Sequence, residues 1–510
     1  MIKIANTTHH ASDTNTEGHY IPKSYRFERD LDNDTQSSRF DSLQFGEQAN
    51  THFVHHDIKE LLTTATGRKL FAEMLNIFFN EQKPRLEKLD GYSRGHNHTI
   101  LTGRRRLENE KSDYRVTHNW GGYISNYITG YVLSNPVTIG TRQADDDESV
   151  VLENIVQINR ANDIDTLNFE LGFDTSRYGR AFELHYRDGN TDKIVQIDPQ
   201  EMFAIRSSSV DKRMIAAVHV PIYNDRIHMT VYTDTEVYTY EPFKHGQFNL
   251  NNYTVKKHMY EEVPVVEWWN NRFRQGDFEN ELSLIDAYDS AQSDTANYMS
   301  DLNDALLVIN GDLTSADIGI EDAIEMKKAN MLLLESGVDH SGKQTNLSAE
   351  YIYKQYDVAG SEAYKTRIVN DIYKLSKMPN LEDDRFNAQQ SGVALRYKLL
   401  GLDQIRSIKE SFYTRSLRKR YRLIENIHRG LSDTQLTADD LTFTFHESIP
   451  EDVWAEVERY VTIGGKVSET TLMELASFID NADDEKRRLA MDGILPDATD
   501  EEINNITGSD

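Results

Sequence analysis

The 510-residue chain contains no cysteine. This excludes disulfide bonds, thiolate catalysis and cysteine-ligated zinc, and it fits folding in a reducing cytoplasm. The chain also lacks a run of about eighteen apolar residues, the length that a membrane-spanning helix requires. Its first ten residues, Met1 to His10, contain no hydrophobic segment of the kind found in signal peptides. We therefore expect neither a membrane-spanning segment nor a signal peptide.

Basic residues are scarce, because 56 lysines and arginines stand against 84 aspartates and glutamates and give a formal net charge of −28. Proteins that grip nucleic acid do so through clustered lysine and arginine, so this balance argues against that class. It does not exclude a protein past which nucleic acid slides without adhering. The hydrophobic content of 38% and the mean hydropathy of −0.64 are low for a monomeric enzyme and leave surface for subunit contacts. The length allows three or four domains.

A polar stretch at 380–392 lies between two long helical patterns. Met378-Pro379 ends the first pattern, because proline cannot donate a backbone hydrogen bond and excludes α geometry from the residue before it. From Val393 a helical period runs to His428. Loops of this length inside compact domains are typically functional or disordered. We interpret this one as functional.

The first half of the chain changes from helical to strand periodicity. Residues 1–50 are polar and have no period, which indicates a flexible N-terminal arm. Helices are predicted within 57–79, 120–133, 150–160 and 165–179, and alternating stretches predict strands at 181–186, 194–197, 214–220, 228–233, 237–240 and 263–269. Short polar turns between the strands are typical of an antiparallel sheet. An α+β domain that ends near Asn270 is therefore expected.

Two amphipathic helices with opposite charge follow this domain. Over 283–306 the apolar side chains fall on one side of the helix, and the other side is acidic: Asp286, Asp289, Asp294, Asp301 and Asp304. Over 361–378 an apolar stripe is accompanied by a basic face: Arg367, Lys374 and Lys377. Residues 307–357 between them predict a compact insert of short strands and a helix. An antiparallel pair with a small domain at one end and a polar loop at the other makes a stalk.

The rest of the chain is predicted to be mostly helical. Glycine weakens a helix interior, so the long helix is expected to kink at Gly401. Alternation at 441–446 predicts a strand that returns to the first-half sheet. Residues 451–490 predict two or three helices, and 496–510 form an acidic tail.

Three stretches, in this order along the chain, resemble the portal proteins of tailed bacteriophages of the siphophage type. They are Asp113 to Ile139 (DYRVTHNWGGYISNYITGYVLSNPVTI), Ser283 to Asn303 (beginning SLIDAYD) and Ser391 to Leu402 (SGVALRYKLLGL). The resemblance implies a ring, usually of twelve subunits, at one vertex of the capsid. It also implies that a separate motor packs DNA through the ring and that DNA later leaves the same way.

The parts of a portal subunit would fall onto this chain in a definite order. They are a wing (51–270 and 393–450), a stem (271–306 and 358–379), a clip (307–357), a tunnel loop (380–392) and a crown (within 451–510). The N-terminal arm (1–50) and the acidic tail that ends the 451–510 region match no part of the family. This is an elongated α+β subunit with an α/β wing, a two-helix stem, a small α/β clip, a long kinked helix and a helical crown. The implied partners are further copies of the chain, double-stranded DNA, a terminase motor, major capsid and scaffolding proteins and a head–tail adaptor, in a virion assembled in the host cytoplasm.

The resemblance also implies which side chains would line the passage. The tunnel-loop residues would touch phosphates without base readout. They are Glu382, Asp383, Asp384, Arg385, Asn387, Gln389 and Gln390. A largely acidic tunnel would repel the phosphate backbone and keep DNA from adhering. Arg367, Lys374 or Lys377 would relieve that repulsion locally, in a way that depends on salt.

The alternative hypothesis is a nucleotide-dependent packaging enzyme or nuclease. It depends on Gly337 to Gln344, which nearly matches a phosphate-binding loop and follows a predicted strand. The last position should be serine or threonine to hold magnesium, so a hairpin turn is the preferred interpretation. The sequence shows no Ser-His-Asp set, paired catalytic carboxylates or zinc signature. We therefore expect no catalysis, no cofactor and no metal.

Three other groups have a structural and a functional interpretation. The histidines at 52, 55, 56, 96 and 98 match no standard metal-site spacing, so solvated loops are preferred. A basic set either contacts DNA or pairs with an acidic surface of the same or a neighbouring subunit: Arg415, Arg418, Lys419, Arg420 and Arg422. Trp268 and Trp269 are expected to pack at the wing–stem junction rather than to hold a ligand.

Overall fold

The computed structural model describes residues 53–55, 57–102, 113–141, 148–189, 191–301, 306–310, 348–352, 357–380, 392–431 and 437–446, and the single helical residues Thr462, Met473 and Leu489. Their mixture of helices and strands confirms the α+β class. The predicted N-terminal arm, most of the insert at 307–357, residues 381–391 and nearly all of the C-terminal region lie outside the described residues. No helix in the described ranges has the length and apolar character needed to cross a membrane.

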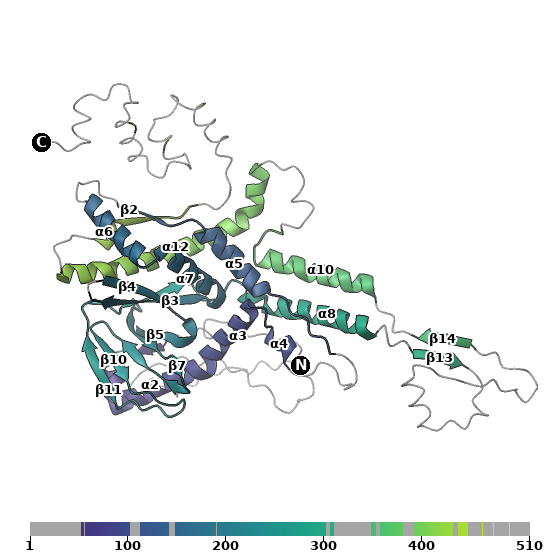
Figure 1. Ribbon diagram of the computed structural model, residues 1–510, viewed down its shortest axis with the longest axis horizontal. Helices are drawn as coiled ribbons and strands as arrows, with labels where there is room; N and C mark the ends of the chain where they lie inside the picture. Colours follow the sequence, from purple (N-terminus) through teal and green to yellow (C-terminus); the bar gives the residue numbers. More distant parts are fainter. Residues whose placement is uncertain are drawn as a thin grey trace, which may run out of the picture.

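The body of the molecule contains two larger sheets (Figure 1). The first has six strands in the order β1-β5-β6-β9-β10-β11: β1 Phe53–His55, β5 Met202–Ser207, β6 Met214–His219, β9 Thr230–Tyr232, β10 Glu236–Tyr240 and β11 Tyr253–Lys257. The second has the order β12-β3-β4: β12 Val265–Trp269, β3 Arg180–Asp188 and β4 Thr191–Ile197. Apolar side chains of both sheets, such as Phe182 and Ala217, form one buried cluster between them.

The prediction of a single antiparallel sheet is therefore wrong. The strands divide between two sheets, and β1 pairs parallel with β5, with Phe53 opposite Ile205. Alternation of apolar and polar residues indicates a strand, but it does not identify the strand with which it pairs. The stretches that form β1, β5 and β11 were not predicted as strands at all. Each of the six strands predicted between residues 181 and 269 does overlap one that the structure contains.

Helices near the start of the chain cover the outer face of the six-stranded sheet. They are α1 (Ile58–Thr63) and α2 (Ala65–Ile77), followed by a π-helical turn (Phe78–Gln82). The next helix, α3 (Lys83–Ser93), belongs to a different core, with Ile124 and Ile285. Leu61, Phe71 and Phe78 are fully buried in the same cluster as Phe203 of β5. Asp57 caps α1, with its carboxylate accepting a hydrogen bond from the backbone N–H of Lys59 at 2.8 Å. These elements confirm the helices predicted within 57–79.

Three further predicted helices occur close to their predicted positions: α5 Trp120–Leu133, α6 Glu148–Ala161 and α7 Ile164–Tyr178. Helix α7 ends at Gly179, whose φ of 83° lies in the left-handed region. A Cβ atom at Gly179 would lie 1.9 Å from the backbone oxygen of Arg274. Only glycine allows the chain to turn so sharply from α7 into β3.

The predicted strand at 441–446 returns to the first half of the chain but joins neither larger sheet. It forms β15 (Leu441–Thr444), which pairs antiparallel with β2 (Thr138–Thr141) as a separate ribbon. The prediction is therefore right about the strand and wrong about its sheet. Alternation alone cannot locate a partner that lies some 300 residues away in the sequence.

The long helix α12 (Gly392–Leu431) confirms the helical pattern predicted from Val393 to His428. Tyr413, Leu417, Tyr421 and Ile424 recur every three or four residues and are buried with Trp268 of β12 in one core. In Figure 1 the beginning of α12 runs in a different direction from the rest of the helix. That the bend lies at Gly401 stays a prediction.

A pair of helices projects from the body (Figure 1), namely α8 (Leu282–Asp301) and α10 (Val358–Leu375), which we call the helix pair. At its far end β13 (Leu306–Asn310) pairs antiparallel with β14 (Ser348–Ile352). The helix predicted over 283–306 is too long, because its described residues end at Asp301 and Leu306 begins β13. The helix predicted over 361–378 starts earlier and ends at Leu375, followed by the C-cap Ser376.

Candidate functional site

The predicted loop at 380–392 connects the body end of the helix pair to the start of α12. The chain is described up to Asn380 and again from Gly392, so the seven predicted loop residues, Glu382, Asp383, Asp384, Arg385, Asn387, Gln389 and Gln390, lie outside the described residues. Their flanks are well anchored. Met378 is buried in one core with Ile372 of α10 and Leu402 of α12.

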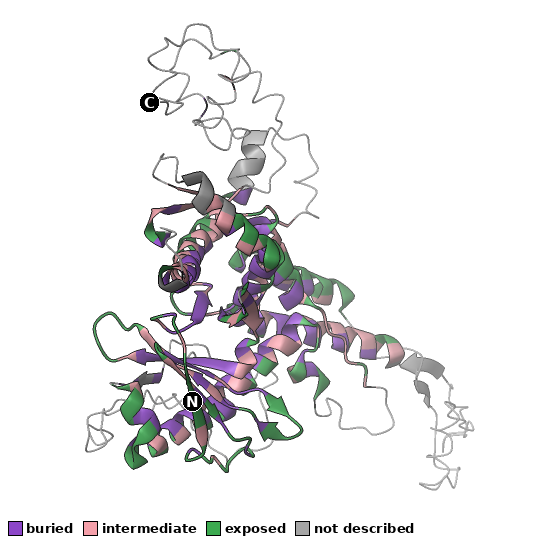
Figure 2. Cartoon of the chain, turned by 60° about the vertical axis from the view of Figure 1, so that its left-hand side comes forward, coloured by how far each residue is buried: buried purple, intermediate pink, exposed green. Residues whose placement is uncertain are grey.

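The three predicted basic residues are all exposed, but only two belong to α10. The Arg367 side chain is 78% exposed, and its Nε lies 3.4 Å from Asp371 Oδ2. Lys374 lies two turns further along the same helix face. Lys377 has a φ of 56° and follows the helix end, so its assignment to that helix face is wrong. Figure 2 shows exposed residues along the side of α10 that faces away from the body.

The predicted acidic outer face of α8 is wrong at its two central positions. Asp286 and Asp289 are fully buried, because the chain wraps over this side of the helix. Tyr92 Oη donates to Asp286 Oδ1 at 2.5 Å, and the Asn97 amide donates to Asp286 Oδ1 and to Asp289 Oδ2, each at 2.9 Å. Burial raises the pKa of Asp286, and these two hydrogen bonds oppose that rise. Asp294 is exposed, as predicted.

An extended segment, residues 113–119, lies along this polar side of α8. The backbone N–H of Tyr114 donates to Asn297 Oδ1 at 2.7 Å, that of Val116 donates to Ser293 Oγ at 2.9 Å, and that of His118 donates to Asp289 Oδ1 at 3.1 Å. The Asn297 amide donates back to the carbonyl oxygen of Tyr114 at 3.0 Å.

The spacing of these contacts follows from two elementary periods. Asp289, Ser293 and Asn297 are four residues apart, which is a rise of about 6 Å along a helix. Two residues of extended chain advance about 6.6 Å, so every second backbone N–H of the segment meets the next polar side chain of α8. The helix therefore presents a ladder of acceptors to a single extended strand. The helical wheel identified Asp289 as a polar position but did not identify Ser293, Asn297 or the segment that binds them.

We expect the double substitution of Ser293 and Asn297 by alanine to release residues 113–116 from α8. Each alanine removes a side-chain acceptor from a backbone N–H, which then exchanges with solvent by local opening. Hydrogen-exchange mass spectrometry should show faster exchange in the peptide that contains Tyr114 and Val116. The matched control is Asp294→Ala on the exposed side of the same helix, which should leave exchange in that peptide unchanged. Equal exchange in both variants would contradict the ladder.

Buried ion pairs fix the base of the helix pair to the body. Lys409 Nζ of α12 lies 2.7 Å from Asp277 Oδ2, just before α8, and also donates to Asn270. Burial alone would lower the pKa of Lys409, but the adjacent Asp277 carboxylate outweighs it and raises that pKa. Arg85 Nε of α3 donates to Glu279 Oε1 at 2.8 Å, and both side chains are buried. Helices α3 and α12 are therefore both joined by buried ion pairs to the short segment that precedes α8.

Most of the basic set in α12 pairs within the chain. Lys419 pairs with Glu262, Arg422 Nη2 lies 2.9 Å from Asp439 Oδ1, and Arg420 is fully buried against Glu183. Pairing within the subunit is therefore the correct alternative for these three residues. Arg415 instead lies over the ring of Trp269, with 4.7 Å between its guanidinium carbon and the ring centroid.

The tryptophans pack as expected, although their neighbours are β3 and α12. Trp268 is buried, its ring centroid lies 5.4 Å from that of Tyr413, and its Nε1 donates to Glu183 Oε2 at 3.0 Å. Trp269 is half-buried among Arg206, Arg274 and Arg415. Both side chains therefore connect β12 to its surroundings through stacking and hydrogen bonding.

His96 and His98 are exposed, in agreement with a solvated loop. The same prediction is wrong for His55, which is buried in β1 and accepts a hydrogen bond from the backbone N–H of Asp57, and His52 and His56 lie outside the described residues.

The residue between His96 and His98, Asn97, is fully buried and caps α4 (His98–Leu101) while it bridges the two α8 carboxylates. The sequence did not reveal this role of Asn97, because the side chain of an asparagine in a turn ordinarily forms hydrogen bonds only with nearby backbone groups. Within the described ranges no group of histidine and acidic side chains has the geometry of a metal site. The near-match to a phosphate-binding loop at 337–344 lies outside them.

Together these features define an elongated α+β chain in which a helix pair projects from a body that contains two sheets and the long helix α12 (Figure 1). The family model described as "Phage portal protein, SPP1 Gp6-like" matches residues 78–493, most of the chain. The chain therefore belongs to the family of SPP1 Gp6-like phage portal proteins.

Two curated relatives are both portal proteins. The portal protein of Bacillus phage SPP1 is 22% identical over 414 residues, which is 76% of this chain and 78% of that protein. The portal protein of Clostridium phage phiCD119 is 22% identical over 357 residues, covering 65% of this chain and 75% of the relative. A solved structure titled "Neck of native GTA particle computed with C12 symmetry" is 12% identical with a TM-score of 0.38, and the match covers 70% of this chain and 88% of that one.

Proposed function

We propose that this chain assembles into a closed ring at one vertex of a phage capsid, and that DNA enters the head and later leaves it through the centre of that ring. The observation that carries the proposal is the family match, which covers residues 78–493 and so includes most of the body, the helix pair and α12. A ring of identical subunits needs one surface patch to bind a different patch of the next copy. The low apolar content and the projecting helix pair are consistent with such contacts.

The proposed parts follow the elements of the fold. The wing would be 51–270 and 393–450, the stem 271–306 and 358–379, the clip 307–357, the tunnel loop 380–392, and the crown with its tail 451–510. The N-terminal arm, residues 1–50, would complete the subunit. This assignment is supported by the antiparallel helix pair, which has β13 and β14 at one end and the loop anchors at the other (Figure 1).

Exposed apolar side chains on the helix pair support contact with a neighbouring copy. Met299 of α8 is 50% exposed, and Tyr364 and Leu375 of α10 are 53% and 59% exposed. Tyr364 and Leu375 belong to the apolar stripe of α10, whose other members Ile368 and Ile372 are buried. Covering them with the next helix pair would remove apolar surface from water and so favour assembly.

Charge would keep DNA from adhering as it moves. Twelve copies at −28 each would carry a formal charge of about −336. We propose that the loop residues at 382–390 border the passage and that Arg367, Lys374 and Lys377 present exposed cations near it. Exposed cations would relieve the repulsion between the ring and the phosphates, and salt would weaken this effect.

The proposed role is structural rather than enzymatic, because portal proteins form a passage and a platform. The partners would be a terminase motor during packaging, the major capsid and scaffolding proteins during head assembly, and a head–tail adaptor afterwards. The subunits would assemble in the host cytoplasm and remain in the virion.

Negative-stain electron microscopy of the purified full-length protein tests the proposal. We expect closed rings with a central hole, and class averages should give the number of subunits. Mass photometry at the same concentration gives an independent mass for the assembly. A stable monomer at micromolar concentration in both measurements would contradict the ring.

A further inference from the structure

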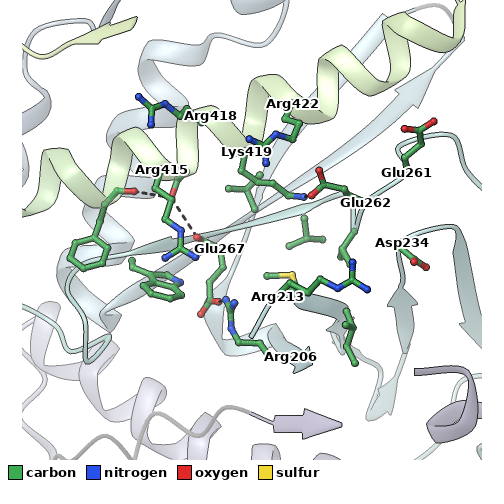
Figure 3. A pocket seen from close by; sticks show the side chains of 18 of the residues that line it. Arg206, Arg213, Asp234, Glu261, Glu262, Glu267, Arg415, Arg418, Lys419 and Arg422 are labelled. Atoms are coloured by element: carbon green, nitrogen blue, oxygen red, sulfur yellow. Dashed lines mark hydrogen bonds and ion pairs between the residues drawn. The ribbon is translucent and has the colours of Figure 1, made fainter. Parts of the chain in front are cut away.

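A groove with a volume of about 940 Å³ lies between α12, the edge strand β12 and the neighbouring ends of β5 and β6, and we call it the α12 groove (Figure 3). One wall is α12, from Ser411 to Arg422. The opposite wall is formed by β6 and β12 and by the start of α1, including Asp57 and Lys59. In Figure 3, Arg415 and Lys419 extend from α12 toward the strands, and Arg206 and Arg213 approach from the other side.

The α12 groove is locally positive in a strongly acidic chain. Seven cationic and five acidic side chains line it, whereas the whole chain has a net charge of −28. Lys419 pairs with Glu262, and Arg206 pairs with Glu267, so much of the acidic lining is already neutralised. Arg213 and Arg415 are exposed and form no ion pair with a carboxylate of the described residues. Their charges remain available to an anionic ligand.

The floor of the groove is apolar. Met214, Ile215 and Val265 line it beside the half-buried Trp269, over which the Arg415 guanidinium lies. An occupant that matches the groove therefore needs carboxylates and apolar side chains close together. A nucleic-acid backbone offers phosphates without apolar groups, so it matches only part of the lining.

The N-terminal arm has this composition and is attached beside the groove. The described chain begins at Phe53, and Asp57, four residues later, already lines the groove. Residues 28–47 carry six acidic side chains against two arginines, interleaved with Leu31, Phe40, Leu43 and Phe45. An extended chain advances about 3.3 Å per residue, so this segment can reach every part of the groove.

We propose that residues 28–47 of the N-terminal arm occupy the α12 groove of their own chain. The acidic side chains pair with Arg213 and Arg415, and the apolar ones cover the floor around Trp269. The short tether favours this intramolecular contact, because it gives the segment a high effective concentration at the groove. When the arm segment occupies the groove, it covers Arg213 and Arg415.

Cross-linking in the full-length chain tests the contact, and the absence of native cysteine makes introduced pairs specific. The test pair is Ser42→Cys in the arm with Ser411→Cys on the α12 wall, treated with a short bis-maleimide. The control pair is Ser42→Cys with Thr366→Cys, an exposed position on α10. Tryptic mass spectrometry should find the 42–411 link within one chain and formed several-fold faster than the 42–366 link.

Charge reversal then tests the recognition. Arg213→Glu with Arg415→Glu should slow the 42–411 link about fivefold to tenfold, and added salt should slow it in the parent. Arg160→Glu makes one such charge reversal at an exposed position of α6, outside the groove, and should leave the rate unchanged. Circular dichroism confirms that each variant is folded. If the double variant is not, Arg213→Glu alone, at an exposed strand end, should slow the link in the same direction.

Three outcomes would overturn the proposal. Equal rates for the test and control pairs would show that the arm does not select the groove. A link that joins two chains, seen as a band of twice the mass on a non-reducing gel, would show that a second copy fills it. Suppression of the link by a short DNA duplex at constant ionic strength would identify the groove as a phosphate site instead.

Discussion

Replacing Arg420 by methionine should lower the free energy of unfolding by about 3–5 kcal/mol, because it leaves a buried carboxylate without its cation. Arg420 and Glu183 are both fully buried. Arg420 Nε donates to Glu183 Oε1 at 2.9 Å, Nη2 donates to Oε2 at 2.6 Å, and Nη1 donates to Asn168 Oδ1 at 2.7 Å. The pair connects α12 to β3, so its loss weakens the contact between the long helix and the three-stranded sheet.

The pH dependence of the Arg420 variant should have the opposite sign to that of the parent. Burial alone would raise the pKa of Glu183, but Arg420 and the hydrogen bond from His185 outweigh it and lower that pKa from 4.5 to about 2. In the parent, this stabilisation is present above pH 4.5 and is lost as the pH falls from 4.5 toward 2. Without Arg420, burial dominates and raises the pKa, so the variant should become less stable as the pH rises and Glu183 ionises.

Urea unfolding followed by tryptophan fluorescence measures both effects, because Trp268 contacts the pair directly. The control is Arg422→Met, which removes an exposed pair with Asp439 and should cost less than about 1 kcal/mol. Removing both buried charges, with Arg420→Met and Glu183→Leu, should recover much of the lost stability. A double variant no more stable than Arg420→Met would contradict this account.

Deleting residues 383–388 should abolish DNA packaging and leave ring assembly intact. Met378 and Leu402, on either side of the loop, are buried in the apolar core that holds α10 and α12. A deletion between these anchors removes none of the described buried contacts. If the loop borders the passage, a shorter loop no longer reaches the DNA, and packaging fails although the ring forms.

Electron microscopy of the deletion variant and nuclease protection of packaged DNA in infected-cell lysates separate the two effects. The matched control replaces the same six residues with glycine and serine, which keeps the length of the loop while removing its charges and amides. If that replacement restores packaging, the length of the loop is the property that packaging requires. If packaging is still lost, the side chains of the loop are required. Failure of the deletion variant to form rings would make the loop a structural element and contradict the prediction.

Local periodicity was sufficient for most elements. The helices α5, α6, α7 and α12 and the strands β3, β4, β6, β9, β10 and β12 were predictable, because each repeats its apolar residues at the period of its own backbone. Charge and the absence of cysteine limited the class of protein, and three motifs in order indicated the family that the family match confirms.

The tertiary structure decided what each polar residue does. The acidic positions of α8 were visible on a helical wheel, but whether Asp286 and Asp289 face water depends on residues that lie far earlier in the chain. Asn97, 189 residues before Asp286, bonds to both carboxylates, and His118, 171 residues before Asp289, bonds to Asp289. Arg420 belongs to a basic run in the sequence and pairs with a glutamate 237 residues away, whereas Arg415 in the same run stays exposed.

The sequence by itself therefore determined the elements, the charge balance and the family of this protein. Only the folded chain decided which strands share a sheet, which carboxylates are buried and where an open groove remains. The physical reason is range: helical and strand periods are set by neighbours a few residues apart, whereas burial and ion pairing are set by segments that meet only after the chain has folded.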